Sequence, residues 1–302
     1  MHLTSLWDFD GAHLAAYIDR ALTLKKEAKA GIRHQSLAGK IIGLVFEKPS
    51  TRTRVSFEAA MYAMGGQVIY LPGRDTQLAR NEPLKDMARV MSRYVSGLVV
   101  RTYGQEIVDE LARYSTVPVI NALTDLHHPC QILSDIMTVI EKKGRVQDLH
   151  IAWVGDGNNM ANSWIQAAAR FGFALTLACP EGYDPDQTIL AQAQREALKP
   201  ITLVRDPLAA VKDADAINVD VWASMGQEAE AELRLTIFQP YQVNTALLAQ
   251  GKPGAIILHC LPAHRGEEIT DEVLEGPQSV AWDQAENKLH IHKAILEKHL
   301  VG

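Results

Sequence analysis

The sequence has 302 residues, 47% of them hydrophobic and 22% charged, which are ordinary values for a globular protein long enough to form two domains. Its formal net charge is −6, and Lys and Arg are scattered along the chain, so the dense basic surface typical of nucleic-acid or membrane-surface binding is excluded. Three widely spaced cysteines, Cys130, Cys179 and Cys260, and the lack of an apolar signal core in residues 1–30 predict a cytoplasmic location. No segment approaches the ~20 apolar residues that span a bilayer, so no membrane partner is expected.

Segments with strand and helix patterns alternate along the whole chain. The expected strands cover residues 40–46, 68–71, 98–103, 117–121, 149–154, 174–178, 201–204, 214–219 and 255–258. The expected helices cover residues 10–30, 84–95, 105–114, 130–143, 159–171 and 284–300, with a further helix opening at Ser50 and a polar loop over residues 220–232. This alternation predicts an α/β protein with two doubly wound parallel-sheet domains, bridged by helices and separated by a cleft. The expected domains are residues 1–134, with a C-terminal helix over residues 285–302 packing back on them, and residues 135–284.

The segment from the first of these strands into the next helix has the pattern of a phosphate cradle. Ser50 or Thr51 can cap the helix, and a helix N-terminus after a buried strand attracts anions through its unpaired N–H groups and its dipole. Arg52 and Arg54 oppose that dipole, and such a break with local preference marks function because a bound anion would reverse the penalty. The alternative is two arginines on a solvated face.

Other polar residues stand at the carboxyl ends of the expected strands, where parallel α/β sheets bind ligands. Arg101 lies inside or just at the end of the third strand, although its charge could also reach solvent. His127 and His128 begin a His-His-Pro-Cys segment, which lacks paired ligand spacing, so no metal is expected. Cys260 is either a small buried hydrophobe or a reactive thiol beside a histidine. Residues 155–157 hint at a dinucleotide loop, but the third glycine of that fingerprint is absent.

Taken together, these motifs resemble the aspartate/ornithine carbamoyltransferase family over nearly the whole chain. The resemblance is carried by Ser-Thr-Arg-Thr-Arg at residues 50–54, His-Pro-Cys-Gln at 128–131, Gly-Asp-Gly-Asn-Asn at 155–159, Ser-Met-Gly at 224–226, His-Cys-Leu-Pro at 259–262 and Ala-Glu-Asn at 285–287. The second-half motifs are similar to the ornithine-using branch, because an aspartate-using member is expected to carry basic residues where this chain has Ser-Met-Gly.

The resemblance implies a cofactor-free reaction in which the δ-amine of ornithine attacks the carbonyl carbon of carbamoyl phosphate. It assigns catalytic roles to Cys260, Arg101, His128 and Asp220. It assigns carbamoyl phosphate binding to Ser50, Thr51, Arg52, Thr53, Gln77, Arg101, His128, Pro129, Cys130, Gln131, Cys260, Leu261 and Lys288. It assigns ornithine binding to Asn159, Asp220, Ser224 and Met225.

The family resemblance also implies a homotrimer or an assembly of trimers, in which Gln77 completes a neighbouring subunit's site. The chain departs from the family at Lys288, where many members carry arginine, and a lysine cannot make a planar two-point contact with phosphate. Alternatives are a carbamoyltransferase for putrescine or an acylated ornithine, a nicotinamide-dependent dehydrogenase and a catalytically silent anion-binding relative. Asp220 and the Ser-Met pair at residues 224–225 argue against putrescine and acylated ornithine as substrates. The missing third glycine of the dinucleotide fingerprint argues against the dehydrogenase.

Overall fold

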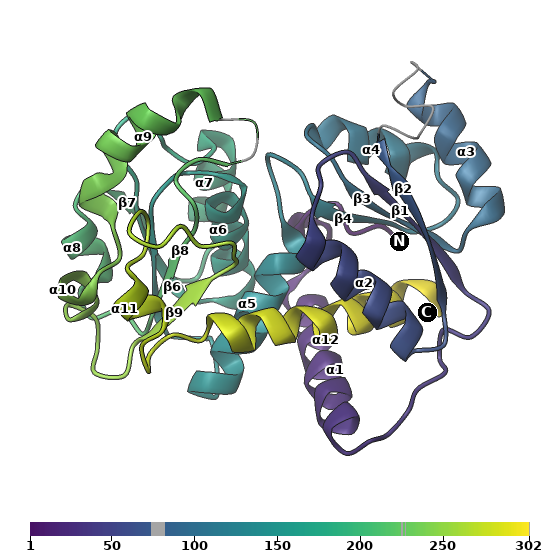
Figure 1. Cartoon of the computed structure of the whole chain (residues 1–302), viewed down its shortest axis with the longest axis horizontal. Coiled ribbons are helices and arrows are strands. Elements are labelled where there is room, and N and C mark those ends of the chain that lie inside the picture. The colour runs from purple at the N-terminus through teal and green to yellow at the C-terminus, as the bar shows by residue number, and fades with distance from the viewer. Residues whose placement is uncertain (74–81, 225, 227, 302) are drawn as a thin grey trace. The chain divides into compact units, whose positions relative to one another are not determined.

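The structure is a computed structural model that describes residues 1–73, 82–224, 226 and 228–301 (Figure 1). The chain divides into two compact units, Met1–Met137 with Glu286–Gly302, and Thr138–Ala285. Both divisions fall within helices, the first in α5 (Pro129–Lys143) and the second in α12 (Ala281–Leu300). The C-terminal part of α12 therefore belongs to the first unit although it is the last segment of the chain.

Unit 1 is built on a parallel four-stranded sheet in the order β2-β1-β3-β4. Its strands are β1 (Ile41–Phe46), β2 (Gln67–Pro72), β3 (Gly97–Arg101) and β4 (Val119–Leu123). Besides its parts of α5 and α12, its helices are η1 (Leu6–Asp8), α1 (Gly11–Lys29), α2 (Thr51–Ala63), α3 (Leu84–Tyr94) and α4 (Gln105–Tyr114). The strand order reverses direction between β1 and β3, so the loops after these neighbouring strands leave toward opposite faces of the sheet.

Unit 2 repeats this design with a parallel five-stranded sheet in the order β7-β6-β5-β8-β9. Its strands are β5 (His150–Val154), β6 (Ala174–Ala178), β7 (Ile201–Val204), β8 (Ala216–Val219) and β9 (Ile256–His259). Its further helical segments are α6 (Asn159–Phe171), α7 (Gln187–Glu196), α8 (Pro207–Val211), η4 (Glu228–Glu230), α9 (Ala231–Phe238), η5 (Gln239–Tyr241), α10 (Thr245–Leu248) and α11 (Asp271–Leu274). Here the order reverses between β5 and β8.

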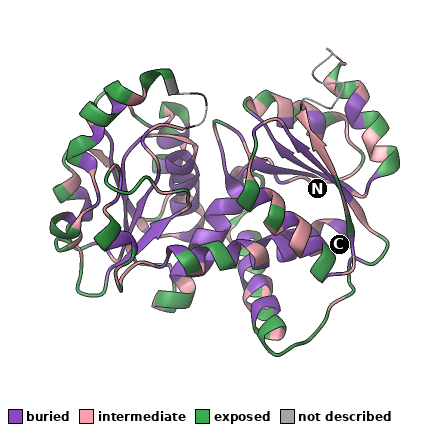
Figure 2. Ribbon diagram, viewed as in Figure 1, coloured by how far each residue is buried: buried purple, intermediate pink, exposed green. Residues whose placement is uncertain are grey.

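The predicted α/β architecture with two parallel sheets is confirmed, and each sheet has its own core. The central strands of both sheets are buried along their length, and the exposed residues gather on the outer helices (Figure 2). Trp153 on β5 and Trp164 on α6 fill the core of unit 2, whereas Phe46 and Phe57 belong to that of unit 1. None of the helices over the described residues combines the length and apolar character that a bilayer span requires.

The expected secondary structure differs from the observed one mainly in unit 2. Helices α7 to α11 were not expected, and α9 begins inside the segment expected to be a polar loop over residues 220–232. Helix α9 also reverses the usual amphipathic arrangement, since Leu233 and Leu235 are exposed and Arg234 is buried. A search for apolar residues at helical spacing cannot detect such a helix, because its leucines are exposed and its arginine is buried. Strand β9 extends to His259, one residue further than expected.

A buried imidazole joins α12 to α2 in unit 1. The ring of His292 stacks on Phe57, with ring centroids 3.6 Å apart and planes at 12°. His292 is fully buried, and neither ring nitrogen has a hydrogen-bond partner among the described residues. Burial, followed by the positive charge of Lys288, lowers the pKa of His292 well below its ordinary value. The ring is therefore neutral in the folded protein, and charging it would oppose the fold.

This burial predicts acid sensitivity with a defined sign. The unfolded chain protonates His292 near its ordinary pKa of about 6.5 while the folded chain does not, so stability is present above that pH and falls as the pH drops below it. His292→Gln should remove about 1.4 kcal/mol per pH unit from the acid slope of the unfolding free energy. Urea unfolding at pH 7.5, 6.5 and 5.5 measures this slope. His13→Gln, which changes an exposed imidazole, is the control, and an unaltered slope in His292→Gln would contradict the prediction.

Candidate active site

The segment after β1 forms the expected helix N-terminus in unit 1. Ser50 is the N-cap of α2, and its hydroxyl accepts a hydrogen bond from the backbone N–H of Thr53 at 3.3 Å. Arg52 is exposed in the first turn. Arg54 instead turns along the helix, where its Nε donates to Glu58 at 2.9 Å and its guanidinium lies 3.6 Å from the ring centroid of Tyr70. The two arginines therefore differ, because Arg54 is engaged by Glu58 and Tyr70 whereas Arg52 is exposed in the first turn.

Lys288 links three segments of unit 1 that are far apart in the sequence. Its Nζ donates to Thr53 Oγ1 at 3.1 Å and to Gln131 Oε1 at 2.9 Å. The amide nitrogen of Gln131 in turn donates to Asp135 at 2.7 Å, which fixes which end of the Gln131 side chain faces the lysine. Lys288 is 6% exposed, so a buried cation holds the cradle and the His-Pro-Cys-Gln segment together.

Arg101 and His128 add a buried cation and a buried imidazole to the same unit. Arg101 is the last residue of β3 and pairs in register with Phe46, the last residue of β1. Burial is the main cause that lowers the pKa of His128 well below its ordinary value, followed by the charges of Lys288 and Arg101. His128 is therefore a neutral imidazole, which can donate one N–H without carrying a charge.

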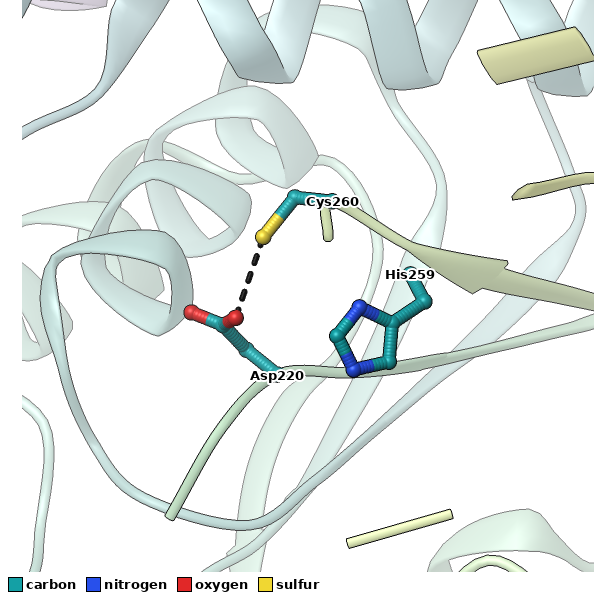
Figure 3. Close-up of side chains that lie close together, drawn as sticks. All are labelled: Asp220, His259 and Cys260. Atoms are coloured by element: carbon teal, nitrogen blue, oxygen red, sulfur yellow. Dashed lines mark hydrogen bonds between the residues drawn. The ribbon is translucent and has the colours of Figure 1, made fainter. Parts of the chain in front are cut away.

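In unit 2, a thiol faces a carboxylate at the ends of two neighbouring strands. The Sγ of Cys260 donates to Asp220 Oδ1 at 3.0 Å, and Figure 3 shows the thiol pointing directly at that carboxyl group. The other oxygen, Oδ2, accepts from Asn158 Nδ2 at 3.1 Å. Asn158 also caps α6, because its Oδ1 accepts from the backbone N–H groups of Met160 and Ala161. Asp220 is thus held from two sides.

The backbone after Cys260 is held by His259. The backbone N–H of Leu261 donates to His259 Nδ1 at 2.9 Å, so the other nitrogen, Nε2, carries the proton and donates to Glu268 Oε1 at 3.0 Å. His259 and Glu268 are both fully buried in their side chains. Leu261 has a φ of 61°, a left-handed conformation that costs energy for a residue with a side chain, so the surrounding contacts must hold it there.

Each of these clusters lies where the order of its sheet reverses. The cradle follows β1 and Arg101 ends β3, the two strands between which the first sheet changes direction. Asn158 follows β5 and Asp220 follows β8, the corresponding pair in the second sheet. Ligands of open parallel sheets bind at such points because the diverging loops leave room there. The chain therefore carries two switch-point sites, one in each unit.

The remaining candidate residues are placed as follows. Gln77 and Met225 lie outside the described residues. Pro129 opens α5, and Cys130 points away toward β4, with its thiol donating to Asn121 O at 3.3 Å. Burial raises the pKa of the Cys130 thiol to about 12, which makes it unreactive.

Asn159 begins α6, and Ser224 follows Asp220 by four residues at intermediate exposure. The amide that contacts Asp220 is that of Asn158. Sequence reasoning did not single out Asp156 or Arg234, which form a buried ion pair at 3.2 Å. The Gly-Asp-Gly pattern around Asp156 was a usable signal, but it was interpreted as a weak dinucleotide fingerprint and as part of a family motif, with no role given to Asp156 itself.

The ligand-type atoms of Asp220, His259 and Cys260 lie within 4.8 Å of one another, a spacing that a metal ion could use. Both nitrogens of His259 are already engaged, one by a backbone N–H and one by Glu268. A metal would have to displace one of these bonds. The cluster is better suited to moving a proton between the thiol and the carboxylate.

Comparison with known proteins agrees with this division into two sites. The family model described as aspartate/ornithine carbamoyltransferase, carbamoyl-P binding domain, matches residues 1–141, and the Asp/Orn binding domain of the same family matches residues 147–298. The chain belongs to the aspartate/ornithine carbamoyltransferase family. The second match includes most of α12, although residues from Glu286 onward pack in unit 1.

Relatives within this family match over nearly the full length. A protein from Desulfotalea psychrophila named ornithine carbamoyltransferase is 73% identical over 299 residues, covering 99% of each chain. A Pseudomonas aeruginosa protein named ornithine carbamoyltransferase, anabolic, is 51% identical, covering 98% of this chain and 96% of its own. The solved ornithine carbamoyltransferase from Pyrococcus furiosus superposes with a TM-score of 0.95 at 49% identity, covering 98% of this chain and 95% of that one.

The loop after β5 of this family member packs so closely that a methyl group does not fit. A Cβ on Gly157 would lie 2.2 Å from both the carbonyl carbon of Asp184 and the nitrogen of Pro185, and neither backbone atom can rotate away. Gly157→Ala should therefore lower the unfolding free energy by about 3 kcal/mol and displace Asn158 from Asp220.

Denaturant unfolding measures the effect of Gly157→Ala. The control is Gly144→Ala, where φ is +80° and the Cβ meets open space, so only a backbone cost of roughly 1–2 kcal/mol is expected. Equal losses in the two variants would show that contact with residues 184–185 is not the cause.

Proposed function

We propose that this protein is an ornithine carbamoyltransferase, which transfers the carbamoyl group of carbamoyl phosphate to the δ-amine of L-ornithine and releases L-citrulline and phosphate. The observation that carries the proposal is the pair of switch-point sites, a positive one in unit 1 and a carboxylate–thiol one in unit 2, within a member of this family. Close relatives carry the same name, and one is named anabolic, which supports a role in arginine biosynthesis.

The phosphate-bearing substrate is assigned to unit 1. Ser50, Thr51, Arg52 and Thr53 would hold the phosphate, because the first turn of α2 offers backbone N–H groups and Arg52 supplies charge. Arg101, His128 and Thr53 would polarise the carbamoyl oxygen as the negative charge develops on it. The neutral state of His128 supports hydrogen-bond donation in place of proton transfer. Gln131 would bind the carbamoyl amide, Lys288 would add a further cation, and Pro129, Cys130 and Leu261 would contribute mainly through their backbone.

The amine-bearing substrate is assigned to unit 2. Asp220 supplies a carboxylate that suits a cationic amino acid, and Asn159, Ser224 and Met225 would bind its amino-acid end. An ammonium with an ordinary pKa of about 10.4 is not a nucleophile, so it must lose a proton before attack. The Asp220 carboxylate, which is hydrogen-bonded to Cys260, would take up that proton before attack. The nitrogen would then bond to the carbonyl carbon to give a tetrahedral intermediate, and as the carbon–oxygen bond breaks the phosphate would leave with the electron pair of that bond and with the second proton that the nitrogen loses.

The remaining assignments concern the assembly and its location. We place the enzyme in the cytoplasm, which its three free cysteines support. We also expect a homotrimer or an assembly of trimers in which Gln77 completes a neighbour's site. Light scattering on the purified protein should then give a mass that is a multiple of three 33.3 kDa subunits. No cofactor is required by the chemistry, since bond making and proton loss are supplied by substrates and side chains.

The substrate assignment is tested by offering four amines separately with carbamoyl phosphate. Turnover is expected with L-ornithine and not with putrescine, N-acetylornithine or aspartate, because only ornithine presents both a free δ-amine and an unblocked amino-acid end. The measurement is release of phosphate together with detection of the carbamoylated product. Turnover with another amine alone would overturn the assignments at Asp220 and Ser224, and none with any amine would overturn the enzyme assignment.

The phosphate cradle is tested by changing, one at a time, Arg52 and Arg54 in the first turn of α2. Arg52→Ala should lower kcat/KM by a factor on the order of 10², because a charge-assisted contact to the transferring group is lost. Arg54→Ala should retain activity, because that side chain is engaged by Glu58 and Tyr70. Steady-state kinetics at saturating ornithine gives both values. Similar losses in the two variants would indicate damage to α2 and not loss of an anion contact.

A further inference from the structure

Arg234 is buried in unit 2 and contacts the backbone between Asp220 and Ser224. Its Nη1 donates to the carbonyl oxygen of Trp222 at 2.8 Å and lies 3.2 Å from Asp156 Oδ2. Its Nε donates to the exposed carboxylate of Glu230 at 3.2 Å. One guanidinium therefore joins the loop after β5, the segment after β8 and helix α9.

The surroundings of this guanidinium are aromatic. It lies 4.8 Å from the ring centroid of Tyr183 and 5.8 Å from that of Phe238, distances at which a cation is attracted to a ring face. The Trp222 side chain stacks on Phe238, with centroids 6.0 Å apart, and is 3% exposed. Trp222 is thus held at both its side chain and its carbonyl, two residues after Asp220.

Arg234 is buried between two exposed leucines, an arrangement that is energetically unfavourable on its own. Arg234 is 5% exposed, whereas Leu233 is 57% and Leu235 is 39% exposed on the same helix. Placing the arginine inside and the leucines outside is unfavourable unless the buried charge is paired and hydrogen-bonded. Asp156 meets that need, although burial raises its pKa to about 6, with a further upward contribution from Asp220 that Arg234 opposes. The Arg234–Asp156 ion pair is therefore buried, at an energetic cost, beside the candidate amine site.

We propose that Arg234 is a positioning residue for the amine substrate: by binding Asp156 and the Trp222 carbonyl, it fixes the segment from Asp220 to Ser224 at the distance from β5 that ornithine binding requires. The inference rests on the proposed function, because it concerns the substrate assigned to unit 2. Arg234 acts through the backbone and touches no reacting atom. Its loss should therefore affect ornithine and leave carbamoyl phosphate, which is assigned to unit 1, unaffected.

The test compares Arg234→Gln, Arg234→Lys and the wild-type chain in steady-state assays in which each substrate is varied in turn. Arg234→Gln is expected to raise the KM for ornithine roughly tenfold or more, since small displacements of a substrate-holding segment have effects of this size, with the KM for carbamoyl phosphate unchanged. Arg234→Lys, which keeps the charge but not the fork of donors, should give a smaller rise in the same direction. Arg170→Gln removes an arginine that pairs with Glu196 elsewhere in unit 2 and should match the wild type.

Each outcome decides the inference. If Arg234→Gln is folded by circular dichroism and binds ornithine as the wild type does, or if both KM values rise together, Arg234 does not position the amine site. If Arg234→Gln does not fold, Arg234→Lys carries the same test, and an unchanged KM for ornithine in that variant overturns the inference. A wild-type protein that makes no citrulline would overturn the proposed function itself, and the inference with it, which separates the two failures.

Discussion

The reversal of strand order in each sheet is the constraint on which the rest of the molecule depends. In each sheet the chain adds strands first on one side of the starting strand and then on the other. Because the crossovers are right-handed, the connections in these two directions cover opposite faces of the sheet. The loops after β1 and β3, and after β5 and β8, therefore diverge and leave their backbone groups available. Because the same winding occurs twice, one chain gains two sites of different chemistry without any change of fold.

The electrostatic character of the two sites follows from what each unit buries. In unit 1 the cations Lys288 and Arg101 act on His128, and burial and these charges lower its pKa. In unit 2 the charge of Asp220 contributes to raising the pKa of Asp156, but Asp156 is already paired with Arg234, so Asp220 is the carboxylate that can serve an amine. A positive site suits an anionic phosphate compound, and a site with carboxylates suits an amine. Such buried charges are costly to leave unmatched, so their signs indicate the substrates that can compensate them.

Sequence reasoning recovered the α/β architecture and most strand ends because those depend on local patterns. Asp220 as the residue after its strand, and Ser50 as one of two possible caps, followed from spacing alone, whereas the third strand was expected to continue to residue 103 and ends at Arg101. The contacts of Arg234 could not be predicted in this way, because a leucine–arginine–leucine run normally buries the leucines, and only the tertiary pairing with Asp156 reverses that preference. The stacking of His292 on Phe57 depends in the same way on a contact between residues far apart in sequence.

Lys288 shows why the last helix of the chain matters to the chemistry of the first unit. The two oxygens that accept hydrogen bonds from its Nζ, Thr53 Oγ1 and Gln131 Oε1, belong to neutral groups, so these bonds orient the ammonium without cancelling its charge. That charge remains effective, since it contributes to the lowered pKa values of both His128 and His292. A lysine has three rotatable donors in place of the planar fork of an arginine, so it can hold both oxygens and still direct charge toward an anion at the N-terminus of α2. Compared with an arginine, Lys288 therefore makes a contact of different shape and the same sign of charge.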